Sequence, residues 1–445
     1  MVANSTNNIF TKKIDIQRAA VNTIFATMLF AGILFLHYNR PVLYMGLILE
    51  DYWGEYATFV CYMLASLLLG WAMLKNKDLQ KPGMALLAVT MFVIAMEEIS
   101  WGQRILNIET PYVVTKLNYQ SELTIHNMID NAIPIEDLFF IAVAIWIFLV
   151  PVAVHIWRPL KIHMTKWGMP LVSTTEYPFF LISLFFFAFR PTIKSDEVKE
   201  VLLAIAFVSF AQALFFNSLN RAATSTAGLF KRKAVLFLVV FIFTGFFVSM
   251  FGITIPRQND RLKGQLHWTA ATDYPRRKLF HQAEKLFDHI LANEKLIREE
   301  TYIQYGILLS QTDNPKAEAI LHKALQQEAA WEIDDSENQK YSRNKGVIYK
   351  LLKDEIRAQV EFERSIQKDK NRLAKIGRYW VVMSMAKTYI AMQNYELAFE
   401  HLNEAKTLVP GEMEKLNVQL WMDRIAVKDE ITHSQYLQML QYLYL

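Results

Sequence analysis

Seven long apolar segments in the first 255 residues limit what this chain can fold into. Each is close to the roughly 20 residues that a helix needs to cross the hydrocarbon core of a bilayer. We therefore expect an all-α fold that begins with a polytopic membrane helix bundle, residues 1–255. A shorter apolar run, residues 41–49, is expected to lie at the interface. The seven expected spans are residues 19–37, 55–74, 83–103, 138–157, 171–189, 199–218 and 234–254.

The distribution of charge separates this transmembrane domain from the rest of the chain. Residues 256–445 carry 28 of the 47 Lys and Arg residues and 27 of the 43 Asp and Glu residues. We expect residues 256–275 to be a linker and residues 276–445 to be a water-soluble helical domain. Cys61 is the one cysteine, which excludes disulfides within the chain and cysteine-based zinc sites. No basic run interleaved with aromatic residues indicates nucleic acid as a partner.

The basic residues of the transmembrane domain indicate its orientation. The N-terminus and the loops near residues 75–82, 158–168 and 219–233 contain 13 of its 19 Lys and Arg residues. Loops rich in Lys and Arg face the cytoplasm. With an odd number of spans, the soluble domain then lies on the outer, periplasmic side. The expected localisation is the bacterial inner membrane, with the N-terminus in the cytoplasm.

Two adjacent carboxylates, Glu97 and Glu98, mark the candidate site, because they lie within the third apolar segment near its end and are costly to bury there. A carboxyl group removed from water is suited to general acid or base catalysis, which is the role we assign to both. Trp101, Gln103 and Arg104 would bind substrate, Arg104 being suited to phosphate or carboxylate. Alternatively, Glu97, Trp101 and Arg104 share a helix face, and Glu97 pairs with Arg104 for structural reasons.

A second pair of residues, in the loop that follows, suggests a metal-binding site. Glu122 and His126 are four residues apart and would lie one helical turn apart. Together with Glu98 they would form an oxygen and nitrogen site that suits a divalent ion such as Zn, Mn or Mg. The alternative is that Glu122 and His126 hydrogen-bond within the loop and only brace it.

Two resemblances bear on this region. The motif EEISWGQR, followed by His126 and Asn127, resembles a pattern of uncharacterised bacterial multi-pass membrane proteins, and it implies no particular activity. The position of Glu50 and Asp51 in the first outer loop is similar to that of the acidic residue in GT-C glycosyltransferases, which implies a substrate-binding role for Asp51. The alternative for this segment, LEDYWGEY, is an interfacial position with its aromatic rings at headgroup level.

The soluble domain contains a recurring pattern. Ala283, Ala317, Ala358 and Ala398 are each followed four residues later by a large apolar residue, at spacings of 34, 41 and 40 residues. Such a period predicts stacked helical hairpins. The segment around Ala386, Tyr389, Ala398, Ala405 and Pro410 resembles the tetratricopeptide repeat. That resemblance implies a curved helical array that binds a protein partner. A generic helical bundle is the alternative.

Two functions are consistent with these observations. One is an envelope enzyme, metal-assisted if Glu98, Glu122 and His126 hold an ion, that acts at the membrane surface on a lipid or lipid-linked substrate. The other is a non-catalytic membrane scaffold for an envelope complex, in which the acids and His126 only hold the outer loops together. Both have membrane lipids and a protein partner of the repeat domain as their partners.

Overall fold

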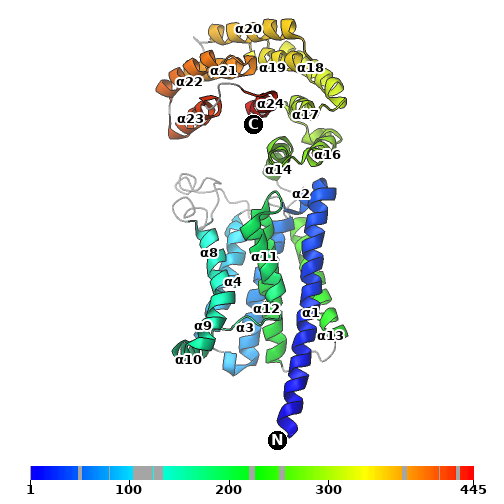
Figure 1. The fold of residues 1–445 in the computed structure, drawn as a ribbon, viewed down its shortest axis with the longest axis vertical. Helices are drawn as coiled ribbons and strands as arrows, with labels where there is room; N and C mark the ends of the chain where they lie inside the picture. Colours follow the sequence, from blue (N-terminus) through cyan, green and yellow to red (C-terminus); the bar gives the residue numbers. More distant parts are fainter. Residues whose placement is uncertain are drawn as a thin grey trace. The chain divides into compact units, whose positions relative to one another are not determined.

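The computed structural model describes residues 2–48, 53–79, 81–103, 124, 134–219, 226–249, 256–372, 378–409, 411–426 and 431–444 (Figure 1). Every regular element in these ranges is a helix, which confirms the all-α prediction. The chain divides into two compact units, residues 1–262 and 263–445. Each unit has a hydrophobic core of its own.

The first unit is a bundle of long helices. The central helix α12 (Ser195–Ser218) is buried along most of its length and packs against α3 (Trp53–Lys75) and α11 (Tyr177–Phe189). Helix α3 also contacts α4 (Pro82–Glu98) and α13 (Thr226–Phe247). Helix α1 (Val2–Asn39) packs against α11 and α13. Helix α8 (Ile135–Ala144) continues through a π-helical turn, η3 (Ile145–Leu149), into α9 (Val150–Ile156).

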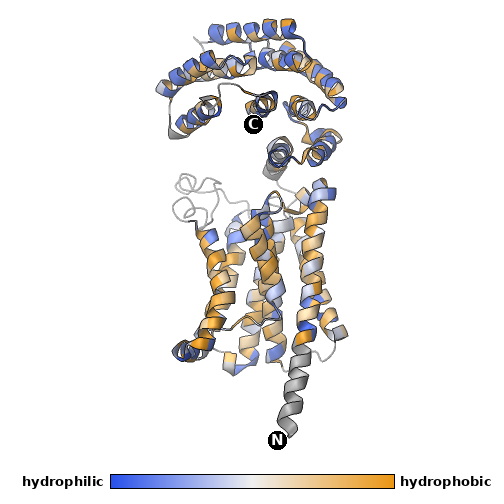
Figure 2. Cartoon of the chain, in the orientation of Figure 1, coloured by the Kyte–Doolittle hydropathy of each residue, from blue (hydrophilic) through white to orange (hydrophobic). Residues whose placement is uncertain are grey.

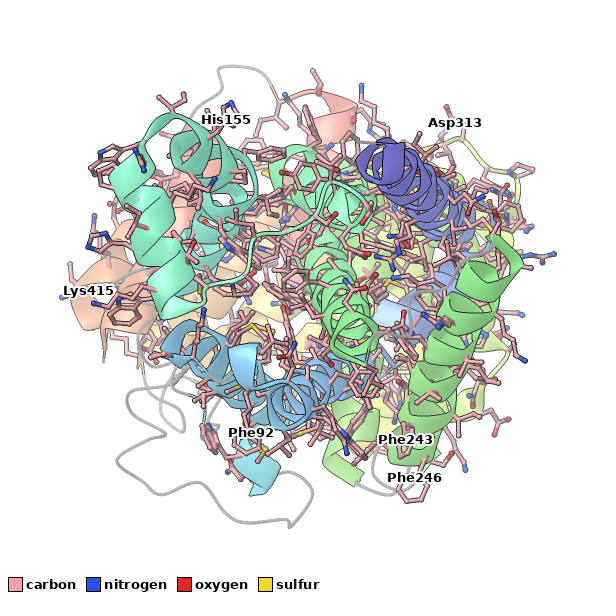
Figure 3. The ribbon with its side chains drawn as sticks, turned by 90° about the horizontal axis from the view of Figure 1, so that it is seen from below. Phe92, His155, Phe243, Phe246, Asp313 and Lys415 are labelled. Carbon is pink, nitrogen blue, oxygen red and sulfur yellow. The ribbon has the colours of Figure 1, made fainter. Side chains whose placement is uncertain are left out.

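The helices of this bundle consist mostly of apolar residues, as expected for helices that face lipid (Figure 2). Phe92 on α4 and Phe243 and Phe246 on α13 point away from the bundle (Figure 3), and each exposes 42–53% of its surface. A soluble protein rarely exposes contiguous patches of such residues, because they are stabilised by leaving water. The surface therefore supports the prediction that this unit is embedded in a membrane.

The predicted number of spans is too high for the described residues. Four helices are long and apolar enough to cross a membrane by length and composition, not seven. They are Ile16–Asn39, Trp53–Lys75, Ile135–Ile156 and Ser195–Ser218. Hydropathy alone identified the other three apolar segments, and it does not register where a helix begins or ends.

The three remaining segments do not meet the criteria for a membrane-spanning helix, each for a different reason. Helix α4 has 17 residues because its helical hydrogen bonding stops at Glu98. Helix α11 has 13 residues and ends where Arg190 adopts a left-handed conformation (φ 44°). Helix α13 has 22 residues, but three cations, Lys231, Arg232 and Lys233, lie near its start. All three still pack within the bundle.

Short helices complete the first unit. Helix α2 (Pro41–Ile48) forms from the short apolar run, and it buries Tyr44 and Met45 in the bundle. The Tyr44 hydroxyl donates to the carbonyl of Ile193 (2.7 Å), while His37 Nε2 accepts from the Ile193 N–H (3.2 Å). These contacts fix the connection between α11 and α12.

Helix α10 (Arg158–Trp167) buries no residue and ends at Gly168, whose φ of 67° favours glycine. The 3-10 turn η1 (Lys77–Leu79) follows α3.

The second unit is a row of helical hairpins, which follow one another along a curve (Figure 1). Its elements are α14 (Pro256–Trp268), the π-helical η5 (Thr269–Asp273), α15 (Tyr274–Arg276), α16 (Phe280–Leu291), η6 (Glu294–Leu296), α17 (Thr301–Ser310), α18 (Lys316–Asp334), α19 (Gln339–Leu351), α20 (Glu355–Arg372), α21 (Arg378–Met392), α22 (Tyr395–Leu408), α23 (Glu412–Ala426) and α24 (His433–Leu443). The tight pairs are α17 with α18, α19 with α20 and α21 with α22.

The same turn occurs four times between paired helices. Lys278, Asp313, Lys353 and Gln393 all have left-handed backbone, with φ between 49° and 65°. After each of them, the next N–H donates to the carbonyl five residues earlier, for example from Asn394 to Tyr389 (2.9 Å). This is the hydrogen bond of a Schellman motif. The turns are spaced by 35, 40 and 40 residues, so the unit has a real structural period.

Small residues recur seven positions before these turns: Ala271, Gly306, Gly346 and Ala386. They allow the two helices of a hairpin to approach closely. A Cβ on Gly346 would lie 2.5 Å from the Phe362 ring, which leaves no room for a side chain. The large residues of the sequence pattern, Phe287, Leu321, Phe362 and Leu402, are all at most 2% exposed. Ala317, unlike Ala283, Ala358 and Ala398, is only half-buried.

The segment predicted as a linker, residues 256–275, is helical. It forms α14, η5 and most of α15, and it precedes the first of the four turns. Its residues Ala270, Ala271 and Tyr274 are at most 1% exposed. From residue 263 onward this segment therefore belongs to the core of the second unit. Pro410, part of the predicted repeat, lies outside the described residues.

The last helix, α24, closes the core of the second unit. Its Tyr436, Leu437 and Leu440 are buried, and the Tyr436 hydroxyl donates to the carbonyl of Ala391 (2.7 Å). The Gln304 amide of α17 donates to the carbonyl of Tyr444 (2.7 Å). A capping box at Thr432 and Gln435 begins α24. The C-terminal helix thus ties together hairpins that are distant in sequence.

Candidate functional site

The predicted catalytic pair lies at the end of α4. Glu97 and Glu98 are its last two residues, and both side chains are half-buried. Three left-handed residues follow within four positions: Ser100 (φ 49°), Trp101 (φ 54°) and Gly102 (φ 79°). Left-handed backbone costs a residue with a side chain about 1–2 kcal/mol, so this turn is strained at two positions. Strain of this kind is concentrated at functional sites.

Trp101 lies beside Glu97, but not in the way that the sequence spacing predicted. The helix ends at Glu98, so Trp101 does not share a helical face with Glu97. The left-handed turn folds it back instead, and its indole N–H donates to the Glu97 carboxylate. Gln103, also predicted to bind substrate, is 6% exposed.

Glu98 faces a group of polar side chains from three other helices. The buried Tyr62 of α3 lies within electrostatic range of Glu98, Glu136 and Glu200. Glu200 of α12 lies within electrostatic range of Glu98 and of Glu136 on α8. Helices α3, α8 and α12 begin at the end of the bundle where α4 ends, so their polar ends meet there (Figure 1). We call this the acidic end of the bundle.

Lys199 supplies the positive charge at the acidic end. It is 2% exposed and contacts Glu136, Asp196 (3.2 Å) and Asp137 (3.9 Å). Its ammonium group also lies over the rings of Phe140 and Phe187, at 5.0 and 5.5 Å from their centres. A buried lysine needs such partners, because an isolated charge in an apolar surrounding is very unfavourable. Lys199 therefore holds the starts of α8 and α12 together.

The other predicted site residues lie outside the described residues. These are Asp51, Arg104, Glu122 and His126. The Glu97–Arg104 pairing and the metal set of Glu98, Glu122 and His126 therefore stay predictions. Within the ranges that the structure describes, no group of three or more His, Cys, Asp or Glu side chains is arranged to hold a metal ion.

Comparison of the chain with known protein families, with curated proteins and with solved structures found no match.

A second candidate site lies in the second unit, where α19, α21 and α23 form a cavity of about 330 Å³. We call it the basic groove. Four cations line it: Lys340 and Arg343 of α19, Arg372 at the end of α20, and Lys387 of α21. The remaining lining residues are polar or aromatic except for Met383, and no carboxylate is among them. They are Asn338, Gln339, Tyr379, Trp380, Met383, Ser384 and Asn417.

Arg343 is the most unusual residue of the basic groove. It is 7% exposed, and its Nε has no hydrogen-bond partner. No carboxylate of the described residues forms an ion pair with it. Asp369, which is 1% exposed, lies within electrostatic range; burial raises the pKa of its carboxyl to about 6, so near pH 7 it is mostly ionised and offsets part of the positive charge. Arg343, Arg372 and Lys387 outnumber this one carboxylate, and the remaining positive charge favours binding of an anion.

The other cations of the groove are held differently. Lys340 is neutralised by Glu299 and Glu300, at 2.8 and 2.7 Å. Arg372 contacts only the amide oxygen of Gln339. Burial, together with the nearby charges of Arg343 and Lys340, lowers the pKa of Lys387 to about 8. Three of the four cations thus have no carboxylate partner within the described part of the chain.

Sequence reasoning did not find these groups. Lys199 and Glu136 were counted only as charges of outer loops and helix ends, although a lysine next to a glutamate at the start of an apolar segment was visible. The groove cations come from three helices separated by up to 47 residues, from Lys340 to Lys387. No local spacing connects them, since helix packing alone brings them to one cavity.

Proposed function

We propose that this chain is an integral protein of the bacterial inner membrane whose helical hairpins, a tetratricopeptide-like array, bind an acidic segment of a partner protein. The observation that carries the proposal is the basic groove, with Arg343 buried and unpaired beside Arg372 and Lys387. This corresponds to the membrane scaffold of the sequence analysis, with the chemistry of the bound segment added.

The lining of the groove favours a peptide over a small inorganic anion. Tyr379, Trp380 and Met383 lie on α21 beside the cations, and Trp380 is 58% exposed. An exposed tryptophan next to arginines suits a chain that alternates carboxylates with apolar side chains. Carboxylates accept bidentate hydrogen bonds from guanidinium groups, which supplies orientation as well as affinity. The proposed ligand is therefore an acidic peptide segment with interspersed apolar residues.

The experiment uses the full chain in detergent and a fluorescently labelled peptide of alternating glutamate and leucine. A matched peptide of alternating lysine and leucine is the control ligand. The variant Arg372→Gln/Lys387→Gln removes two cations of the groove. Its matched control, Lys323→Gln/Lys353→Gln, removes two exposed cations elsewhere in the same unit. Binding is measured by fluorescence anisotropy.

We expect the groove variant to weaken binding of the acidic peptide on the order of tenfold or more, because each lost charge-assisted hydrogen bond is worth about 1.5–3 kcal/mol. The control variant should bind within twofold of the wild type. Binding should also weaken as the pH rises above about 8, where Lys387 loses its proton. Equal affinity in both variants, or equal affinity for the lysine peptide, would contradict the proposal.

An envelope enzyme remains the second candidate, and one observation favours it. Glu98, which precedes the strained turn at Ser100 and Trp101, lies within electrostatic range of the carboxyl group of Glu200 and the phenol of Tyr62. Such a set could transfer protons, and a metal held by Glu98, Glu122 and His126 could activate water. The substrate would be a lipid or lipid-linked compound at the membrane surface, bound by Trp101, Gln103, Arg104 and Asp51.

Metal analysis distinguishes the enzyme from the scaffold. If the three residues hold a divalent ion, purified protein contains about one equivalent, and Glu98→Gln and His126→Ala each remove it without lowering the melting temperature of the metal-free protein. If they only brace the loops, purified protein contains no such ion and both variants melt earlier. Metal retained in both variants would contradict the metal site.

The proposed orientation rests on the excess of Lys and Arg on one side and on all three shorter apolar helices, α4, α11 and α13, also crossing the membrane, since four crossings alone would return the chain to the side of its N-terminus. A reporter that is active only in the periplasm, fused after Leu445, should be active. A reporter that is active only in the cytoplasm, fused at the same place, should be silent. The opposite result would reverse the orientation.

A further inference from the structure

The end of the bundle opposite to the acidic end contains a polar pocket that neither proposed function uses. It lies between α1, α12 and α13 and the segment just before α11, and its volume is about 40 Å³. A water molecule needs roughly 10–15 Å³ by this measure, so the pocket has room for a group of several heavy atoms. Its apolar wall consists of Val21, Ala213, Phe216 and Leu229.

The floor of the pocket is a satisfied ion pair. Glu176, which is 2% exposed, accepts hydrogen bonds from Ser209 (2.7 Å) and Lys233 (3.4 Å). Lys233 also contacts the Ser209 hydroxyl, and it lies 5.3 Å from the centre of the Phe179 ring. Glu176 and Lys233 therefore neutralise each other. Because Glu176 is already engaged, it leaves the other cations of the pocket uncompensated.

Those other cations are two arginines. Arg18 of α1 donates to the amide oxygen of Asn217 (3.3 Å), which uses one of its five N–H donors. Arg232 of α13 covers the ring of Phe216, 4.2 Å from its centre. The two guanidinium groups are close enough to repel each other. No carboxylate among the described side chains pairs with either arginine, so the pocket has a charge of about +2 with Lys233 and Glu176 included.

We propose that this pocket binds a phosphate group, carried either by an anionic phospholipid of the adjacent leaflet or by a soluble phosphate compound. Two convergent guanidinium groups supply the donors that a phosphate accepts in pairs. A bound dianion or monoanion also removes the repulsion between Arg18 and Arg232. A zwitterionic lipid is a poor ligand, because its phosphate arrives with a cation attached.

The test measures the melting temperature of the full chain in three settings. The first is nanodiscs of phosphatidylcholine, the second is nanodiscs of equal parts phosphatidylcholine and phosphatidylglycerol, and the third is phosphatidylcholine nanodiscs with added inorganic phosphate. The site variant is Arg18→Gln/Arg232→Gln. A charge-matched control, Lys161→Gln/Lys231→Gln, removes two exposed cations near the same end of the bundle. A third variant, Arg18→Lys/Arg232→Lys, keeps the charge and tests for misfolding.

We expect phosphatidylglycerol to raise the melting temperature of the wild type and of the control Lys161→Gln/Lys231→Gln by about 5 °C, as saturating ligand does. The site variant should show no such rise, and the Arg→Lys variant a partial one. A rise with inorganic phosphate alone, also lost in the site variant, would identify a soluble phosphate compound as the ligand. An equal rise in the site variant and the control, or no rise in any setting, would overturn the proposal.

Discussion

Buried carboxylates of the second unit differ in whether they have a cation. Glu332 of α18 contacts Lys345 and Lys368 at 2.6 Å each. Although burial alone would raise the pKa of Glu332, the hydrogen bonds from Lys345 and Lys368 lower it to about 2. Glu328, one turn earlier, is 1% exposed and receives a hydrogen bond only from the amide of Asn344 (3.0 Å). Burial raises the pKa of Glu328 to about 8, against the effect of Asn344.

Glu328 therefore makes stability depend on pH. Its folded-state pKa lies above its unfolded value, so its contribution is fully present below about pH 4.5 and is lost as the pH rises through 8. Glu328→Gln stays neutral and keeps an oxygen that can accept from Asn344. We expect this variant to be more stable than the wild type at pH 8 by on the order of 4 kcal/mol, and nearly equal at pH 4.5.

Hydrogen exchange of the buried amides of α18 and α19 in the full chain measures this difference at both pH values. The control is Glu363→Gln, on the exposed face of α20, which should leave the free energy of unfolding unchanged at either pH. The same stability gain in Glu363→Gln, or none in Glu328→Gln, would show that Glu328 is not protonated in the folded protein.

Lys199 in the first unit contrasts with Glu328. Glu328 is a buried carboxylate without a cation, whereas Lys199 is a buried cation with three carboxylate partners. Removing one partner of such a group leaves the others uncompensated. We expect Lys199→Met to lower the free energy of unfolding in detergent by roughly 2–4 kcal/mol, below the loss for a fully enclosed pair because Glu136 and Asp196 are 40% and 51% exposed. Melting curves provide the measurement, with the exposed Lys75→Met as the matched control. Equal melting temperatures for the two variants would contradict the role of Lys199.

At the scale of elements, the four left-handed turns define the hairpins of the second unit. None of the four residues is glycine, although glycine adopts this conformation at the lowest cost. Asn314, Asp354 and Asn394 follow three of them, and each accepts a hydrogen bond from a backbone N–H at the start of the next helix. The turns thus end one helix and begin the next within two residues.

Lys353 is suited to test the turn, because its side chain is exposed and its φ is 63°. Lys353→Gly should stabilise the second unit by about 0.5–1 kcal/mol, since it relieves the left-handed strain of a residue with a Cβ. The control is Lys323→Gly, in the middle of α18, which should destabilise by about 1 kcal/mol. Both are read from hydrogen exchange or melting of the full chain. A loss of stability in Lys353→Gly would contradict the turn geometry.

At the scale of the whole molecule, the second unit begins earlier than its composition indicates. His267 is 2% exposed and contacts the carbonyl of Leu296 (3.1 Å), Gln304 (3.3 Å) and Thr301 (3.3 Å). Burial lowers the pKa of the His267 imidazole, which is therefore kept neutral among these partners. Residues from 263 to 276 thus cover the core at α16 and α17.

We therefore expect a fragment of residues 256–445 to be more stable than one of residues 276–445. The shorter fragment loses the buried side chains of Leu266, His267 and Tyr274, and its melting temperature should be lower by on the order of 10 °C. Circular dichroism melts of both fragments supply the comparison. Equal melting temperatures would indicate that residues 256–275 do act as a linker.

Several features followed from the sequence alone, because they depend on local composition and periodicity. Apolar segments of about 20 residues indicated membrane helices, and the charged half indicated a separate helical unit. The spacing from Ala358 to Phe362 and from Ala398 to Leu402 indicated the paired faces that are buried in the structure. The adjacent Glu97 and Glu98 marked the region of the strained turn, although the sequence predicted a helix that continues to residue 103. These signals all lie within a few turns of one helix.

Only the tertiary structure decided the features that require separate segments to meet. The left-handed turn at Ser100 ends α4 before Trp101, and no residue type in SWG requires that conformation in a non-glycine position. Packing of α8 against α12 gave Lys199 its carboxylates, and packing of α19 beside α21 left Arg343 buried without one. Whether a charge is costly or satisfied depends on what lies within a few ångströms of it, and that distance is set by the fold rather than by the order of residues.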